Sequence, residues 1–236
     1  MSDTAKPEVH ASHEALAHHF ANLQQQKAAA QLGMWVFIAQ EVLFFGGLFA
    51  AYAVYSMRYT EAFEAGSAHL SWPIGFFNTL VLIGSSLTMA MGVHSAARGR
   101  SKQIVAYLLA TILLGSVFLG VKYFEYEAKI APCFGVEAGP GCLVPGGRFD
   151  ASVLHVAADK APPTQIFYSL YFAMTGLHAL HMIIGIPIIA LIAYSAWKGR
   201  YSTAWHTPVE IVGLYWHFVD IIWIFLFPLL YLMGMH

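Results

Sequence analysis

The chain has 236 residues, of which 58% are hydrophobic and only 11% are charged, and its mean hydropathy is +0.59. A soluble domain carries about 25% charged residues, and a soluble domain of this length could not bury so much apolar surface. The composition also excludes an intrinsically disordered chain, and the net charge of −1 excludes a nucleic-acid-binding protein. We therefore expect an integral membrane protein.

The first 28 residues are predicted to form a polar tail that precedes the membrane domain, residues 29–236. They lack the order of charge, apolar core and cleavage site that marks a signal peptide. The helical spacing of Leu16, Phe20 and Leu23 favours a short amphipathic helix over residues 12–26, lying on the membrane surface. The tail contains four histidines, for which a metal site is an alternative to a solvated tail. These are His10, His13, His18 and His19.

Five apolar runs follow the tail, and each is long enough to cross a bilayer as a helix. A helix rises about 1.5 Å per residue, so a hydrocarbon core of ~30 Å takes about 20 residues. The runs are nearly continuously apolar and do not alternate as barrel strands do. They cover residues 29–57, 72–97, 102–127, 164–197 and 208–235. The predicted fold is all-α: a polytopic membrane protein with a bundle of five transmembrane helices.

Positive charges in the short turns predict the orientation of the bundle. Five spans place the two termini on opposite sides of the membrane. Both cationic turns, residues 98–102 and 198–200, fall on the same side as the N-terminus. The positive-inside rule therefore predicts a cytoplasmic N-terminus, with the segment 58–71, the long loop 128–163 and the C-terminus outside.

The long loop 128–163 contains both cysteines of the chain, Cys133 and Cys142, among Pro and Gly residues. If this loop faces a bacterial periplasm, a disulfide between them is favoured. Two reduced, unpaired thiols are the alternative.

Glu41 lies near the middle of the first apolar run, where a charge costs at least ~2.5–3.5 kcal/mol. Its own helix offers no cation nearby, and burial disfavours the charged form, so we expect a protonated carboxyl at rest. Two interpretations are open. Glu41 is either a proton-linked or lipid-contacting acid, or a neutral carboxyl hydrogen-bonded to a neighbouring helix.

Further polar residues lie at membrane depth in the last two runs. His178 and His181 are three residues apart and share one helical face. Together with Glu210 and His217 they form one possible metal site. Hydrogen bonds between helices are the favoured alternative, because polar groups in a membrane must find partners. Asp220, one turn from His217, is predicted to form a local pair with it.

Four segments resemble motifs of subunit III of the haem–copper oxidases, of the cytochrome c oxidase type. The first, residues 33–45, contains Glu41 in GMWVFIAQEVLFF. The second, residues 122–126, contains Glu125 in KYFEY. The third and fourth are FAMTGLHALHMIIG at 172–185 and YWHFVDIIW at 215–223, with Glu210 upstream of the latter. The resemblance covers residues 30–235, and the last two motifs are long and specific.

The resemblance implies a non-catalytic subunit of a proton-pumping terminal oxidase that reduces oxygen to water with electrons from cytochrome c. In this family the haem and copper belong to partner subunits, and subunit III binds phospholipid and no redox metal. The implied partners are subunit I directly, subunit II and other oxidase subunits, and membrane lipids, in a bacterial inner membrane.

The resemblance also implies roles for the polar residues. Glu41 becomes the reactive membrane carboxyl of the family, a proton-linked group. The others become a buried polar network or lipid contacts: His178, His181, Glu210, His217, Asp220 and Glu125.

Five spans correspond to the five-helix bacterial type. Seven-helix members have two more N-terminal helices, which form part of their lipid cleft. The 36-residue outer loop is longer than the core pattern leads us to expect. One hypothesis is that it docks a partner such as another respiratory complex.

Other functions are open from the sequence. Within the family, the chain could serve a quinol oxidase or a nitric-oxide-reducing assembly. From a different class, it could be a stand-alone transporter or metal-binding protein that uses His178, His181, Glu210 and His217.

Overall fold

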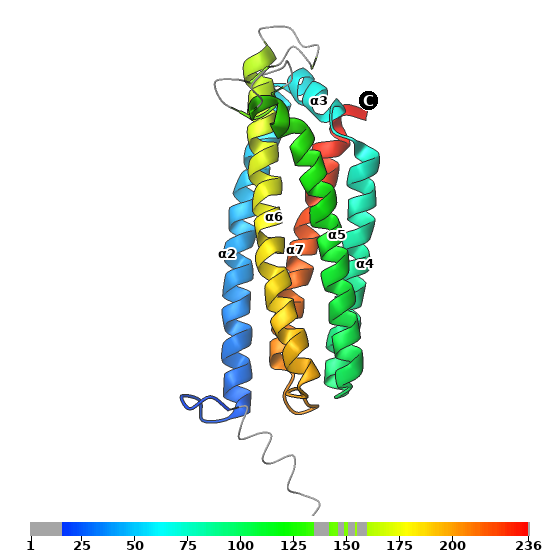
Figure 1. Cartoon of the computed structure of the whole chain (residues 1–236). Helices are drawn as coiled ribbons and strands as arrows, with labels where there is room; N and C mark the ends of the chain where they lie inside the picture. The colour runs from blue at the N-terminus through cyan, green and yellow to red at the C-terminus, as the bar shows by residue number, and fades with distance from the viewer. Residues whose placement is uncertain (1–15, 135–141, 146–148, 151–153, 155–159, 236) are drawn as a thin grey trace, which may run out of the picture.

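The computed structural model is an upright bundle of long helices (Figure 1). It describes residues 16–134, 142–145, 149–150, 154 and 160–235. Within these residues it has six α-helices and one 3₁₀-helix. They are α2 (Leu23–Arg58), α3 (Thr60–Ala68), α4 (Trp72–Ala97), α5 (Ser101–Phe134), α6 (Ala161–Trp197), α7 (Thr207–Tyr231) and η3 (Met233–Met235).

The predicted all-α fold with five membrane spans is confirmed, because α2, α4, α5, α6 and α7 are each long and apolar enough to cross a bilayer. The observed helix α4 has the predicted bounds. The other four differ by a few residues at their ends, and α7 stops at Tyr231 before the 3₁₀ turn. The chain is therefore a multi-pass helical membrane protein.

Prolines and glycines mark where the helices begin and end. Pro73, Pro162 and Pro208 lie in the first turns of α4, α6 and α7, where a missing backbone N–H costs nothing. Gly99 and Gly199 follow α4 and α6 with φ angles of 67° and 70°, the left-handed conformation that ends a helix. These two glycines produce the tight turns at one end of the bundle.

The predicted amphipathic helix over residues 12–26 is wrong over residues 16–22, whereas residues 23–26 form the first turn of α2. Residues 16–22 are not helical, and α2 begins at Leu23 after the cap residue Asn22. The side-chain oxygen of Asn22 accepts a hydrogen bond from the backbone N–H of Gln25 at 2.8 Å. This cap satisfies a free donor of the first turn and so fixes the start there. His10 and His13, and residues 12–15, lie outside the described residues.

The segment 58–71, expected to be a loop, contains the short helix α3. It packs against α6 and η3, and Phe63 is fully buried. The Ser67 hydroxyl donates to the carbonyl of Leu230 at 2.8 Å. Glu61 pairs with Lys160, and that hydrogen bond and positive charge lower the pKa of the Glu61 carboxyl below its usual value. Helix α3 thus closes the end of the bundle where the C-terminus lies (Figure 1).

The long loop is shorter than predicted, because α5 continues to Phe134 and α6 begins at Ala161. Half of the segment proposed to dock a partner lies outside the described residues. The structure joins Cys133 and Cys142 by a disulfide, with a distance of 4.8 Å between their Cα atoms. This bond fastens residue 142 to the last turn of α5.

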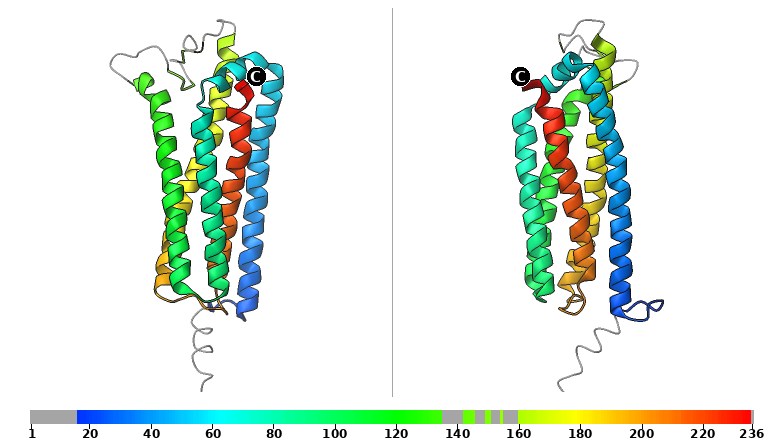
Figure 2. Two further views of the ribbon diagram at one scale, coloured as in Figure 1. Left: turned by 90° about the vertical axis from the view of Figure 1, so that its right-hand side faces the viewer. Right: turned by 180° about the vertical axis from the view of Figure 1, so that it is seen from behind.

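Helices α4, α5, α6 and α7 pack around one core, and α2 stands at the edge, against α6 and α7 (Figure 2). The largest core side chains are Trp216 and Trp223 of α7. The Trp216 ring lies so close to Gly115 and Gly185 that an added Cβ would meet it at 2.9 and 3.1 Å. Small residues on α5 and α6 therefore make the slot that holds this indole.

Candidate functional site

Glu41 of α2 faces His181 of α6 across the edge of the bundle. Its carboxyl is 7% exposed, and Oε2 lies 3.4 Å from His181 Nε2. Its other oxygen, Oε1, accepts a long hydrogen bond of 3.5 Å from Gln40 Nε2. The basic partner of Glu41 thus comes from another helix, which is why the sequence of α2 alone gave no sign of it.

A backbone carbonyl fixes the ring of His181. Its Nδ1 lies 2.8 Å from the carbonyl oxygen of Leu177, which can only accept, so we assign the hydrogen to Nδ1. In the neutral ring Nε2 is then an acceptor that faces Glu41. A proton placed between Nε2 and Oε2 can belong to either group: carboxylic acid with imidazole, or carboxylate with imidazolium.

Apolar groups surround this Glu41–His181 pair. The Phe45 ring lies 5.8 Å from the His181 ring, and the Tyr215 hydroxyl donates to the His181 carbonyl at 2.8 Å. On the outer side of α2, Val42 and Leu43 are 53% and 78% exposed, as expected for a surface facing lipid or another subunit. The pair is therefore buried, and the residues that follow Glu41 in α2 lie on the outer surface of the bundle.

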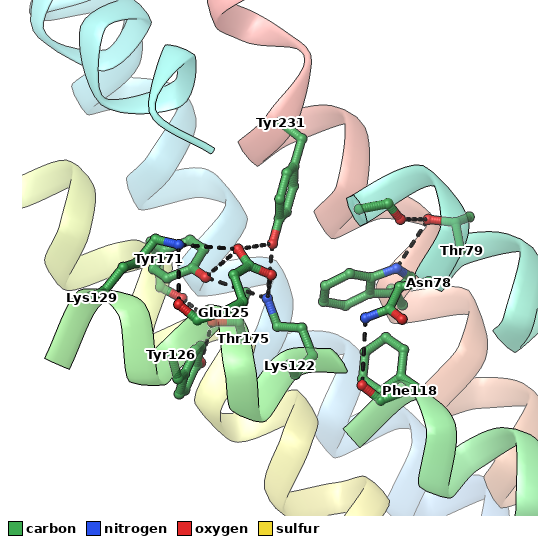
Figure 3. A network of polar contacts seen from close by, with 12 residues as sticks. Asn78, Thr79, Phe118, Lys122, Glu125, Tyr126, Lys129, Tyr171, Thr175 and Tyr231 are labelled. Carbon is green, nitrogen blue, oxygen red and sulfur yellow. Dashed lines mark hydrogen bonds and ion pairs between the residues drawn. The ribbon is translucent and has the colours of Figure 1, made fainter. Parts of the chain in front are cut away.

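Glu125 belongs to a second buried ionic group, termed here the α5 cluster: Lys122, Glu125, Lys129, Tyr171 and Tyr231 (Figure 3). Lys122 Nζ donates to Glu125 Oε2 at 2.9 Å and to the Tyr231 hydroxyl at 2.8 Å. Both tyrosine hydroxyls donate to Glu125 Oε1, at 2.8 and 2.7 Å. Lys129 Nζ lies 3.4 Å from the same oxygen. One carboxylate therefore faces two ammonium groups.

Sequence reasoning identified Glu125 but missed both lysines. Their spacing, three before and four after Glu125, places all three residues on one helical face and was a usable signal. Lys122 is only 4% exposed. Its ammonium group lies over four aromatic rings at 5.1–5.5 Å, and such faces stabilise a desolvated cation.

The remaining predicted residues do not form one network. His178 is 1% exposed between the rings of Phe118 and Trp223, and neither ring nitrogen has a hydrogen-bond partner in the described part of the chain. The carboxyl of Asp220 interacts with the hydroxyls of Ser86 and Ser85 on α4 and not with His217, so the predicted pair with His217 is wrong. His217 Nδ1 instead lies 2.7 Å from the Ser86 hydroxyl.

Glu210 lies at the opposite end of the bundle from α3. It pairs with Lys27 at 2.8 Å and with His206 Nε2 at 3.0 Å, and the Lys27 pair links the second turn of α2 to the first turn of α7. The four residues of the possible metal site, His178, His181, Glu210 and His217, thus have different neighbours. Among the residues that the structure describes, no group of three or more His, Cys, Asp or Glu side chains could hold a metal ion.

These features define a class: a five-span membrane protein whose buried carboxyls face histidine and lysine. The model of the family "Cytochrome c oxidase subunit III" matches residues 9–137 and 155–235. The chain belongs to this family, as the four motifs indicated. It is thus a subunit of haem–copper terminal oxidases.

Individual relatives include proteins with different electron donors in their names. The chain is 32% identical to cytochrome c oxidase subunit 3 of Thermostichus vulcanus over 203 residues, 86% of each chain. It is 30% identical to quinol oxidase subunit 3 of Bacillus subtilis, over 86% of this chain and 87% of that protein. Cytochrome c oxidase subunit 3 of Loxodonta africana is 31% identical, over 92% of this chain and 73% of that protein.

Proposed function

We propose that this chain is the non-catalytic subunit III of a proton-pumping cytochrome c oxidase in a bacterial inner membrane, with its N-terminus in the cytoplasm. Oxygen reduction by haem and copper takes place in the partner subunits, and subunit I is the direct neighbour. The 32% identity to the Thermostichus vulcanus subunit supports cytochrome c as the donor. The cationic turns at residues 98–102 and 198–200 support the orientation.

We also propose that this subunit supports proton uptake by the catalytic subunit, and the Glu41–His181 pair is the observation that carries this role. A neutral acid beside a neutral imidazole can pass its proton from Glu41 Oε2 to His181 Nε2 without changing the net charge of the pair. A second proton converts the pair to carboxylic acid and imidazolium. The 3.4 Å separation needs only a small side-chain movement to reach the 2.7–2.9 Å of a charge-assisted hydrogen bond. The pair modulates proton supply to the catalytic subunit and is not an obligatory carrier.

Lipid binding and stabilisation of the catalytic subunit complete the proposal. The outward face of α2 is apolar over most of its length, with large exposed side chains such as Trp35 and Phe44. Such a face is covered in the membrane by lipid or by a neighbouring subunit. Both kinds of contact stabilise the assembled complex.

The test is isolation of the native complex through a tag on this chain. We expect subunits I and II to co-purify, a reduced-minus-oxidised haem spectrum, and oxygen consumption with reduced cytochrome c. Isolation of the chain without oxidase subunits, from cells that assemble an active oxidase, would contradict the proposal.

A second candidate is subunit III of a quinol oxidase, which the 30% identity to the Bacillus subtilis protein favours. The same preparation separates the two. Oxygen consumption with a quinol but not with reduced cytochrome c would select the quinol oxidase.

A further inference from the structure

A groove of about 420 Å³ lies between the start of α4 and the end of α5. It is termed here the α4–α5 groove. Its polar lining includes His69, Ser71, Glu125 and Lys129. Its apolar lining includes Ile74, Val121 and Phe124. The α4–α5 groove is separate from the Glu41–His181 pair and has no part in the role proposed for that pair.

The two kinds of lining are sorted along the membrane normal. On α5, which runs toward the α3 end of the bundle, Lys129 is nearer that end than Val121 and Phe124. Helix α4 runs the other way, so His69 and Ser71, before its start, are nearer the α3 end than Ile74. Both walls are thus polar toward the α3 end and apolar toward the bundle centre. A phospholipid, with its polar headgroup and apolar chains, has the same order.

The depth of Lys129 fits a headgroup. Lys122 lies 21 residues beyond Ser101, about 32 Å along the helix, which is close to the ~30 Å thickness of a hydrocarbon core. Lys129 lies seven residues farther, about 10 Å, and so reaches the level of the headgroups. Phe124, between them, is 69% exposed at the edge of the core.

The charge of the α5 cluster favours an anionic occupant. Lys122 and Lys129 approach the Glu125 carboxylate from opposite sides, as Figure 3 shows, and both are less than one-tenth exposed. Lys122 has short bonds to Glu125 and Tyr231. The contacts of Lys129 to Glu125, through Oε1 and the backbone carbonyl, are both 3.4 Å long. With both lysines and Glu125 ionised, the cluster has two positive charges and one negative charge. Of the two lysines, Lys129 is the one that lines the groove.

We propose that the α4–α5 groove binds an anionic phospholipid. Its phosphate pairs with the Lys129 ammonium group beside His69 and Ser71, and an acyl chain lies along Ile74, Val121 and Phe124. Free phosphate would leave the apolar half of the groove uncovered, and a lipid without net negative charge would leave the extra ammonium group uncompensated. This inference specifies a site for the lipid binding in the proposed function, and it rests on that part of the proposal alone.

The experiment uses the tagged native complex, washed with detergent and reconstituted with phosphatidylglycerol or phosphatidylcholine, and counts the bound lipid by native mass spectrometry. We expect retention of phosphatidylglycerol and little phosphatidylcholine. Lys129→Gln should lower phosphatidylglycerol retention about tenfold, because a hydrogen bond to a charged group is lost. Lys129→Arg should keep it. Lys198→Gln, at an exposed lysine of the opposite end, is the matched control and should not change it.

Val121→Trp tests the apolar half of the groove while leaving Lys129 in place, and it should also lower phosphatidylglycerol retention. Equal retention of the two lipids by the wild type, or unchanged retention in Lys129→Gln, would overturn the proposal. Displacement of the lipid by millimolar inorganic phosphate would overturn it in favour of a simple anion site. A neighbouring subunit cross-linked through the groove would overturn it as well. Co-purifying haem, measured on the same samples, tests the oxidase assignment separately.

Discussion

At the scale of single residues, the buried carboxyl groups of the chain differ in the side chains that they contact. Glu125 has two lysines and two tyrosine hydroxyls, Glu41 has one imidazole, and Asp220 has the hydroxyls of two serines. Removing one member of a buried ion pair is costly because it leaves the other charge uncompensated, whereas an excess charge can be removed at little cost. The two lysines of the α5 cluster differ in this respect.

Lys122→Met should therefore destabilise the protein by about 3–5 kcal/mol, because the long contact to Lys129 would be the remaining ion pair of Glu125 in the cluster. Lys129→Met should cost less than about 1 kcal/mol, because the remaining Lys122–Glu125 pair is neutral overall. The measurement is the apparent melting temperature of each variant in the same detergent. Equal destabilisation by the two substitutions would contradict the claim that Lys122 is the main ionic partner of Glu125.

Chemical labelling tests the proton shared by Glu41 and His181. A hydrophobic carbodiimide reacts with protonated carboxyls, so it should label Glu41 in the membrane, and Glu41→Gln should abolish the label without loss of assembly. His181→Gln should raise the labelling rate severalfold, because the imidazole no longer accepts the proton. His94→Gln, at an exposed histidine of α4, is the control. An unchanged labelling rate in His181→Gln would contradict the proposal that Glu41 exchanges its proton with His181.

At the scale of the helices, close packing depends on glycines at defined positions. Gly115 and Gly120 lie on the same helix, but only Gly115 faces Trp216. An added Cβ at Gly120 meets nothing within 4 Å. Alanine substitutions at these two glycines therefore separate the effect of helix propensity on stability from the effect of steric crowding.

Gly115→Ala should destabilise the bundle by about 1–3 kcal/mol, because the new methyl group must displace the Trp216 ring. Gly120→Ala should leave stability unchanged or raise it by up to about 1 kcal/mol. Thermal unfolding of the two variants, followed by circular dichroism, gives the comparison. A larger loss for Gly120→Ala than for Gly115→Ala would contradict the packing of α7 against α5.

The helices also show what the sequence could and could not predict. The five spans follow from apolar runs, because a membrane requires about 20 apolar residues of each. Helix α3 was missed because it is short and its burial depends on α6 and η3, which no local pattern encodes. Leu16, Phe20 and Leu23 have helical spacing, but the Asn22 cap begins the helix after two of them. Contact between Glu41 and His181 depends on how α2 packs against α6, so it could not be predicted from either helix.

At the scale of the whole molecule, the chain is a helical bundle with the buried Glu41–His181 pair between α2 and α6 and with the α5 cluster toward the α3 end. Membership of this family implies that the chain has other oxidase subunits as partners. Within the described residues, no three His, Cys, Asp or Glu side chains lie close enough together to hold a metal ion. The central claim is that this subunit handles protons and lipid and leaves electron transfer to its neighbours.

Metal analysis of the chain after separation from the native complex tests that claim most directly. The account predicts a colourless subunit with no stoichiometric iron, copper or zinc, and recovery of all haem in the fraction with the partner subunits. Tightly bound metal in a one-to-one ratio with this chain, lost on substitution of its own histidines, would contradict the account.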